Sequence, residues 1–162
     1  MSAAAKPKPK SRRGRPSVET QRVLYQIRIH GWDVSWSFGL ASSYYSRADE
    51  GSYSEYLILT LRGKVIYPEG FKYPDVECQL SADPRLSQDV APATSIGSLT
   101  ATESRLMAYI PVRRERMGAL IAGADRFRNL QLNAAPLRYR RALVMSINLD
   151  SEEEPDWQSD TS

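Results

Sequence analysis

The sequence has very few of the residues that bind metals or form disulfides: one cysteine and one histidine in 162 residues. Cys78 therefore has no partner for an intrachain disulfide, which fits a reducing compartment. With His30 as the single imidazole, a zinc site built mainly from cysteine and histidine is excluded within one chain. The Walker A pattern and the Gly-x-Gly-x-x-Gly pattern are also missing. We therefore expect no metal site and no cofactor.

Long apolar runs are missing as well. No run approaches the roughly 18 residues that indicate a membrane span, and no apolar segment of a secretory signal follows the basic N-terminus. Pro7, Pro9 and Pro16 argue against the amphipathic helix of a mitochondrial leader. With 41% hydrophobic and 25% charged residues, the composition is typical of globular proteins. We expect a soluble intracellular protein, in the cytoplasm, the nucleoid or a nucleus, without a membrane partner.

Patterns that indicate enzymatic chemistry are equally sparse. His30 alternates outward on a predicted strand, and no motif links it to a serine or a carboxylate. Cys78 falls on an apolar strand face, which favours a buried, inert thiol over a nucleophile. Asp75 and Glu77 share a polar strand face, where a solvated pair is the simpler interpretation and a cation or acid–base pair the alternative. Whether the protein is an enzyme stays open, and the sequence favours a non-catalytic role.

Charge is distributed very unevenly along the chain. Residues 1–16 hold six basic residues and no acid, which gives +6, whereas residues 150–162 hold six acids and no base, which gives −6. The residues between them carry the remaining +3 and are only mildly basic. Both ends also lack apolar periodicity, which is typical of disorder. We expect a disordered basic tail at 1–21, a single β-rich domain at 22–150 and a disordered acidic tail at 151–162.

Alternation of apolar and polar residues predicts most of the domain to be strands. From Val23 to Ile29 the apolar residues occupy every second position, and at Gly31 this pattern shifts by one residue. Such a shift at a glycine predicts a β-bulge or a tight bend. The apolar face that follows contains Trp32, Trp36 and Phe38. We expect these aromatic side chains in the core, with a stacking platform for bases or sugars as the alternative.

The remaining segments complete a mainly β fold. Residues 42–54 and 81–95 have turn and loop compositions, and a helix is predicted over 113–122 from apolar residues at positions 117, 120, 121 and 124. A C-terminal hairpin is predicted, whose last strand has Leu143, Met145, Ile147 and Leu149 on one face. The expected fold is a mainly antiparallel β-sandwich or open barrel with one short helix. Further strands are predicted over residues 57–61, 76–80 and 106–110.

The basic tail contains a short DNA-binding pattern, Arg13-Gly14-Arg15-Pro16. These four residues resemble the core of the AT-hook family, which implies that Arg13 and Arg15 enter the minor groove on either side of Gly14. Narrow A·T-rich minor grooves are strongly negative and attract arginine, and the glycine lets the backbone lie deep in the groove. The expected DNA-binding residues are Lys8, Lys10, Arg12, Arg13, Gly14, Arg15 and Pro16. The alternative is a solvated basic leader.

Other candidate contacts are scattered over the chain. Tyr44 and Tyr45 in the polar loop and Trp157 in the acidic tail are candidate partner-binding residues, because tyrosine and tryptophan are enriched at recognition surfaces. A basic face is a candidate anion-binding or nucleic-acid-binding site. The acidic tail is expected either to be a solvated end or to compete with DNA for the basic tail. The arginines of the basic face are Arg113, Arg114, Arg116, Arg138 and Arg140.

The sequence therefore favours a non-catalytic binding protein with a DNA-contacting arm. One hook binds weakly, near the non-specific range of roughly 10⁻⁴–10⁻⁶ M, so the domain is expected to add a second contact or an oligomer. The alternative is a protein-interaction or assembly module in which the arm is only a leader. A small-molecule-binding barrel or an enzyme stays open as a third class.

Overall fold

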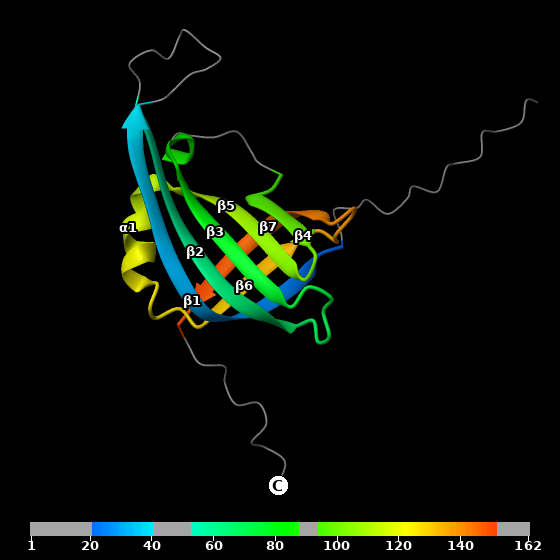
Figure 1. The fold of residues 1–162 in the computed structure, drawn as a ribbon. Helices are drawn as coiled ribbons and strands as arrows, with labels where there is room; N and C mark the ends of the chain where they lie inside the picture. Colours follow the sequence, from blue (N-terminus) through cyan, green and yellow to red (C-terminus); the bar gives the residue numbers. More distant parts are fainter. Residues whose placement is uncertain (1–20, 41–52, 88–93, 152–162) are drawn as a thin grey trace, which may run out of the picture.

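Seven strands close into a barrel in the computed structural model, which describes residues 21–40, 53–87 and 94–151 (Figure 1). The strand order is β1-β2-β3-β5-β4-β7-β6, and β3 and β5 are parallel while all other neighbours are antiparallel. The elements are β1 (Val23–Leu40), β2 (Tyr53–Tyr67), β3 (Asp75–Asp83), the 3₁₀ turn η3 (Pro84–Ser87), β4 (Gly97–Thr102), β5 (Arg105–Arg113), α1 (Arg114–Gly123), β6 (Asn129–Ala134) and β7 (Arg141–Asp150). The predicted mainly β fold with one helix is confirmed.

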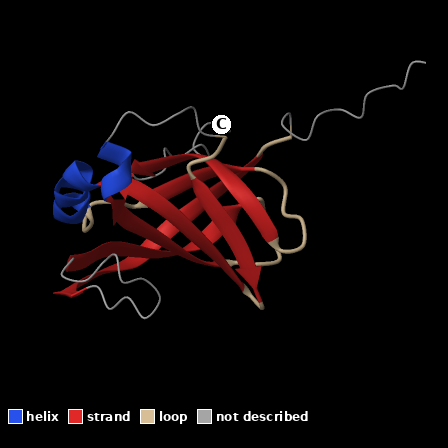
Figure 2. Cartoon of the chain, turned by 90° about the horizontal axis from the view of Figure 1, so that it is seen from above, coloured by secondary structure: helices blue, strands red, loops and turns tan. Residues whose placement is uncertain are grey.

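The strands β1 and β2 form a hairpin that is much longer than the barrel is tall. β1 has 18 residues, yet β6 pairs with it only over Val23–Arg28. The two segments predicted on either side of Gly31 are therefore one continuous strand, and the predicted bulge is confirmed by the register shift between Ile29 and Gly31. Beyond this bulge β1 has no β6 partner, and past Ser35 and Ile58, where the pairing of β2 with β3 ends, the hairpin projects beyond the other strands on the side where the helical segments lie (Figure 2).

The interior of the barrel is filled by the alternating apolar residues of the strands. Leu59, Leu99, Leu106, Leu132 and Val144 are fully buried, as expected for side chains that face the inside of a small barrel. Neighbouring strands also approach each other closely at Gly63, where β2 lies against β1, and at Gly97, where β4 lies against β5. At both positions an added Cβ would collide with a backbone carbonyl of the neighbouring strand. At these two positions the packing of the sheet itself requires glycine.

The helix α1 covers one side of the barrel, and its position matches the sequence-based prediction to within one residue. Met117 and Ala124 are buried, and Leu120 and Ile121 pack on the core with their remaining surface exposed. All four belong to the apolar stripe expected from the spacing of the sequence, which is confirmed. No side chain caps the helix N-terminus, so contacts with the barrel are the main source of its stability.

Three details of the predicted strands are wrong. The strand β4 was not predicted, and Tyr53 lies in β2 rather than in the polar loop. In β7 the register against β6 shifts between Asn133 and Ala134. This bulge makes Leu143 face outward, 46% exposed, whereas Ile147 packs against the core. The four apolar residues of this strand therefore do not share one face, because an extra residue reverses the alternation.

The basic arm with its Arg-Gly-Arg-Pro pattern lies outside the described residues, as do Tyr44, Tyr45 and Trp157. Their predicted roles stay predictions. Within the described ranges, no helix is long and apolar enough to cross a membrane.

Candidate nucleic-acid interface

The basic arm joins the barrel beside the turn that connects β6 and β7. Val23, at the start of β1, pairs with Ala134, the last residue of β6. The chain then passes through residues 135–140 and returns as β7. Figure 1 shows the beginning of β1 and this turn next to each other on the right of the barrel. The start of β1 therefore lies close to the β6–β7 turn.

The tip of this turn, Arg138-Tyr139-Arg140-Arg141, is called the basic turn below. The backbone N–H of Arg138 donates to the carbonyl of Arg141 at 2.8 Å, and the N–H of Arg141 donates back to the carbonyl of Arg138 at 2.9 Å. Tyr139 and Arg140 between them have φ values of 51° and 63°. These are the features of a two-residue type I′ hairpin turn, which Asn-Gly fills with the least strain.

The side chains of the basic turn are available to a ligand. Tyr139 is 100% exposed, and the three arginines are exposed and form no ion pair with another described residue. The turn thus presents a tyrosine ring among three guanidinium groups that no described acidic side chain compensates. Arginine donates paired hydrogen bonds to phosphate, and tyrosine offers a flat face for packing.

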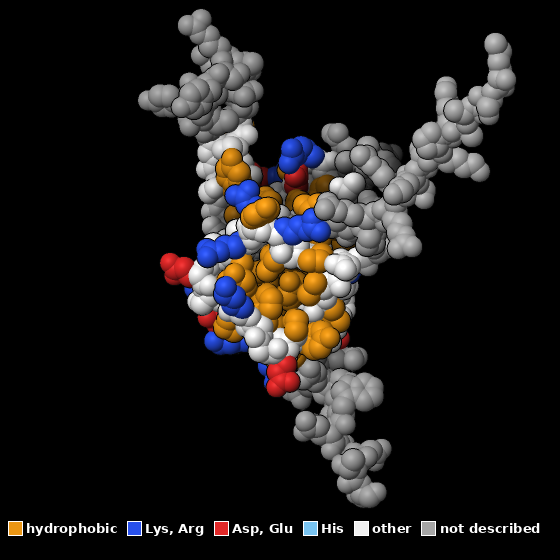
Figure 3. Space-filling model, turned by 90° about the vertical axis from the view of Figure 1, so that its right-hand side faces the viewer, with side chains coloured by type: hydrophobic (Ala, Val, Ile, Leu, Met, Phe, Trp, Pro, Cys, Tyr) orange, Lys and Arg blue, Asp and Glu red, His pale blue; other side chains and the backbone are white. Residues whose placement is uncertain are grey.

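The barrel surface around this end has a mixed character. Seen from the right of Figure 1, hydrophobic side chains gather on the molecule, with Lys and Arg side chains beside them (Figure 3). The cations on this face therefore form discrete groups beside the hydrophobic side chains and are not spread over the whole face.

The five arginines predicted as one basic face fall into two separate groups. Arg140 lies beside Ala101, whose N–H donates to the Arg140 carbonyl, and Ala101 pairs with Leu106 near the start of β5. Arg113 is the last residue of β5, seven residues after Leu106. This separation corresponds to roughly 23 Å at about 3.3 Å per residue. Arg138 therefore belongs with Arg140, and neither lies in a strand.

The second group lies where β5 enters α1. Arg113 and Arg116 are exposed and have no ion pair with a described residue, whereas Arg114 is paired with Glu55 of β2. Arg116 borders an apolar pocket of about 470 Å³, lined also by Leu120 and Phe127. This pocket lies between α1 and the barrel, far from the base of the arm.

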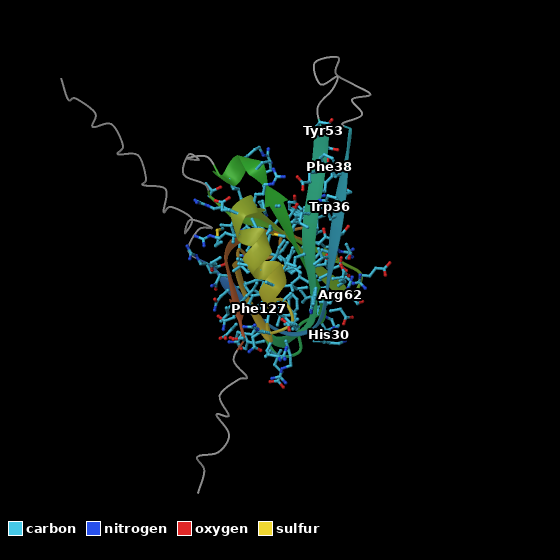
Figure 4. The ribbon with its side chains drawn as sticks, turned by 90° about the vertical axis from the view of Figure 1, so that its left-hand side faces the viewer. His30, Trp36, Phe38, Tyr53, Arg62 and Phe127 are labelled. Carbon is cyan, nitrogen blue, oxygen red and sulfur yellow. The ribbon has the colours of Figure 1, made fainter. Side chains whose placement is uncertain are left out.

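The aromatic stripe of the projecting hairpin does not lie in the core, so that prediction is wrong. Trp32, Trp36 and Phe38 are 43%, 62% and 57% exposed. Tyr53 joins the stripe from β2: its ring stacks on Phe38 with centroids 5.3 Å apart, and Phe38 stacks on Trp36 at 6.4 Å. Figure 4 shows Trp36, Phe38 and Tyr53 one after another along the hairpin, with His30 near its base. The stripe is exposed because the distal part of the hairpin extends beyond the strands that close the barrel, so its inner face is left uncovered by the other described strands.

The candidate catalytic groups have ordinary structural roles. Cys78 is fully buried, and burial raises the pKa of its thiol to about 12, which keeps it protonated and unreactive. Asp75 accepts a hydrogen bond from Lys64 at 2.6 Å, which lowers the pKa of that carboxyl group. Glu77 is paired with Arg105 at 3.4 Å. Among the described residues, no group of three acidic, histidine or cysteine side chains is arranged to hold a metal ion.

The sequence-based prediction included Arg138 and Arg140 of the basic turn but gave no role to Tyr139. The available signal was an aromatic residue within a run of arginines, a combination that some single-strand-binding surfaces use for stacking and phosphate contacts. Comparison of the chain with protein families, with curated proteins and with solved structures gives no match.

Proposed function

We propose that the protein is a non-catalytic DNA-binding protein, in which the basic arm contacts an A·T-rich minor groove and the basic turn contacts the adjacent phosphates. The observation that carries this proposal is the position of the basic turn. Three arginines without an ion pair among the described residues and an exposed tyrosine lie near the start of β1, where the arm enters the barrel.

The two elements complement each other physically. Arg13 and Arg15 supply the preference for A·T pairs, because a narrow minor groove concentrates negative potential. Such a short contact binds weakly by itself. Arg138, Arg140 and Arg141 add phosphate contacts that are independent of sequence and fix the position of the barrel on the duplex. Since the two elements are linked through the start of β1, the second contact is an intramolecular event and strengthens the first.

A direct test uses fluorescence anisotropy of labelled A·T-rich and G·C-rich duplexes with the full chain. The variant Arg13→Ala/Arg15→Ala is expected to lose the preference for the A·T-rich duplex. The variant Arg138→Gln/Arg140→Gln/Arg141→Gln is expected to weaken binding to both duplexes by a similar factor, because phosphate contacts carry no sequence information.

The matched control is Arg113→Gln/Arg116→Gln/Arg126→Gln, which removes three exposed arginines that form no ion pair with a described residue from the region of α1. Its affinity is expected to fall only slightly, through the change in net charge. If this control loses as much affinity as the basic-turn variant, the basic turn is not a specific contact. If the arm variant keeps its A·T preference, the arm is not a minor-groove hook.

A second candidate function is a protein-assembly module, which is favoured by a different observation: the exposed aromatic stripe. An apolar surface of this kind is typical of a protein interface. Salt separates the two functions, because DNA binding weakens steeply with salt and an apolar interface does not. The two functions are compatible if assembly brings several arms together.

A further inference from the structure

The outer edge of β1 is an open sheet edge. Within the described residues, β6 pairs with β1 over Val23–Arg28, and the last contact on that side is the hydrogen bond from the Ile29 N–H to the Arg128 carbonyl at 2.8 Å. Residues 30–40 are hydrogen-bonded to β2 along their other edge only. Such a strand presents a row of unpaired backbone donors and acceptors, which is a template for another strand.

The same strand carries a large apolar surface on one face. Trp32, Trp36, Phe38 and Tyr53 together expose about 450 Å² if each ring residue has roughly 200 Å² of surface. When two copies pair edge to edge, the rings of one copy lie beside those of the other on one face of the joined sheet, so part of this surface is buried together with the open backbone edges.

The sequence of this edge is complementary to itself. If two copies of β1 pair antiparallel with Ser35 opposite Ser35, then Trp32 lies opposite Phe38 and Val34 lies opposite Trp36. All apolar side chains then meet on one face of the joined sheet, and aromatic pairs of this kind stabilise antiparallel strands. On the other face Asp33 lies opposite Ser37, so no like charges face each other. A two-fold symmetric arrangement is the commonest form of homodimer.

The charges around the stripe favour a protein copy over a nucleic acid. Glu55, the charged residue on the apolar face, accepts a hydrogen bond from Trp36 Nε1 at 3.1 Å and is paired with Arg114. On the opposite face Asp33 is paired with Arg62. The charges of the hairpin itself are thus compensated among the described residues, and the free cations Arg113 and Arg116 belong to the junction of β5 and α1, whereas a nucleic-acid platform needs free cations along the rings.

We propose that this face and edge of β1 bind a second copy of the chain, so that two hairpins form one continuous four-stranded sheet, β2-β1-β1-β2, with the aromatic stripes packed together. The proposal is independent of DNA binding, since it uses the end of β1 that lies away from the arm. It also supplies a reason for the hairpin to extend beyond the barrel.

The test is sedimentation velocity of the full chain from about 1 to 100 μM, a range that covers dissociation constants in the micromolar range. The chain is expected to shift from monomer to dimer over this range. The variant Trp36→Lys/Phe38→Lys is expected to stay monomeric, because the two lysines would meet the copy's apolar face. The matched control Tyr109→Lys/Leu143→Lys changes two side chains of 49% and 46% exposure elsewhere on the barrel and is expected to dimerise normally.

The strand pairing is tested by a single cysteine. Ser35→Cys places two thiols opposite each other at the proposed two-fold axis, and mild oxidation is expected to give a covalent dimer. Ser98→Cys, on the exposed outer face of β4, is the control and is expected to run as a monomer on non-reducing denaturing gels. The native Cys78 is buried and does not interfere. A monomer at all concentrations, a dimer that survives Trp36→Lys/Phe38→Lys, or a dimer that Ser35→Cys does not cross-link would each overturn the proposal.

Discussion

The basic turn places two non-glycine residues, Tyr139 and Arg140, in the left-handed region of φ. For an L-residue this conformation costs about 1–2 kcal/mol. Replacing the pair by Asn-Gly, the sequence that a type I′ turn prefers, should therefore stabilise the fold. We predict that the double substitution Tyr139→Asn/Arg140→Gly makes the protein more stable and at the same time a weaker DNA binder.

The magnitude follows from the exposure of both side chains. Tyr139 is fully exposed, and Arg140 has no ion pair among the described residues, so no packing is lost. Glycine at position 140 relieves about 1–2 kcal/mol of strain but adds about 0.4–1 kcal/mol of entropy to the unfolded chain. With a smaller gain from asparagine, the net stabilisation is about 1–1.5 kcal/mol. For a domain of this size that corresponds to a rise in Tm of roughly 4–6 °C.

Urea unfolding monitored by tryptophan fluorescence measures the stability, and duplex titration measures the affinity. Loss of one guanidinium and one ring from the turn is expected to cost about 1 kcal/mol of binding, or roughly fivefold in Kd. Glu103→Gly is the matched control: Glu103 also has a positive φ, 46°, but the substitution removes no cation. It should stabilise the protein without weakening DNA binding. A stabilised double variant with unchanged affinity would refute the assignment of the turn, and an unstabilised one would refute the strain argument.

Two further predictions concern the acidic tail and the buried thiol. Deleting residues 151–162 is expected to tighten binding to DNA, and more so at low salt, because the tail then no longer competes for the basic arm; unchanged affinity at low salt would count against this competition. Burial raises the pKa of Cys78 from 9.0 to about 12, so the folded state holds this proton more tightly than the unfolded state does. The stabilisation that this raised pKa gives to the folded state is complete below pH 9. As the pH rises toward 12 it is lost, and the free energy of unfolding falls by up to about 1.4 kcal/mol per pH unit. The Cys78→Ala variant should lack this part of the alkaline decline in urea titrations; an identical decline in both proteins would contradict the assignment.

The features of the fold that could be predicted are those encoded by local alternation. The bulge at Gly31, the apolar stripe of α1 around Met117 and the burial of Cys78 all follow from which side chains share a face. The parallel pairing of β3 with β5 could not be predicted in this way, because η3 and the whole of β4 lie between the two strands in the sequence. Strand β4 was missed because its six residues contain only two apolar side chains, Leu99 and Ala101, at interior positions.

The exposed aromatic stripe shows the limit of such reasoning most clearly. Alternation correctly placed Trp32, Trp36 and Phe38 on one face, but it carries no information on whether another element covers that face. The answer depends on how far the other strands reach, and both β6 and β3 end before the distal half of the hairpin. The left-handed residues of the basic turn were equally hidden, because Tyr139 and Arg140 are not the glycine or asparagine that normally mark such a turn.

The most direct test of the central claim is the salt dependence of DNA binding by the full chain. The apparent association constant for an A·T-rich duplex, measured at several salt concentrations, is expected to fall linearly on a double logarithmic plot. Each phosphate contact contributes about 0.9 to the slope, so Arg138→Gln/Arg140→Gln/Arg141→Gln should reduce it by up to about 2.7. The same slope in the wild-type chain and in this variant, or no measurable binding of the wild-type chain at low salt, would contradict the account.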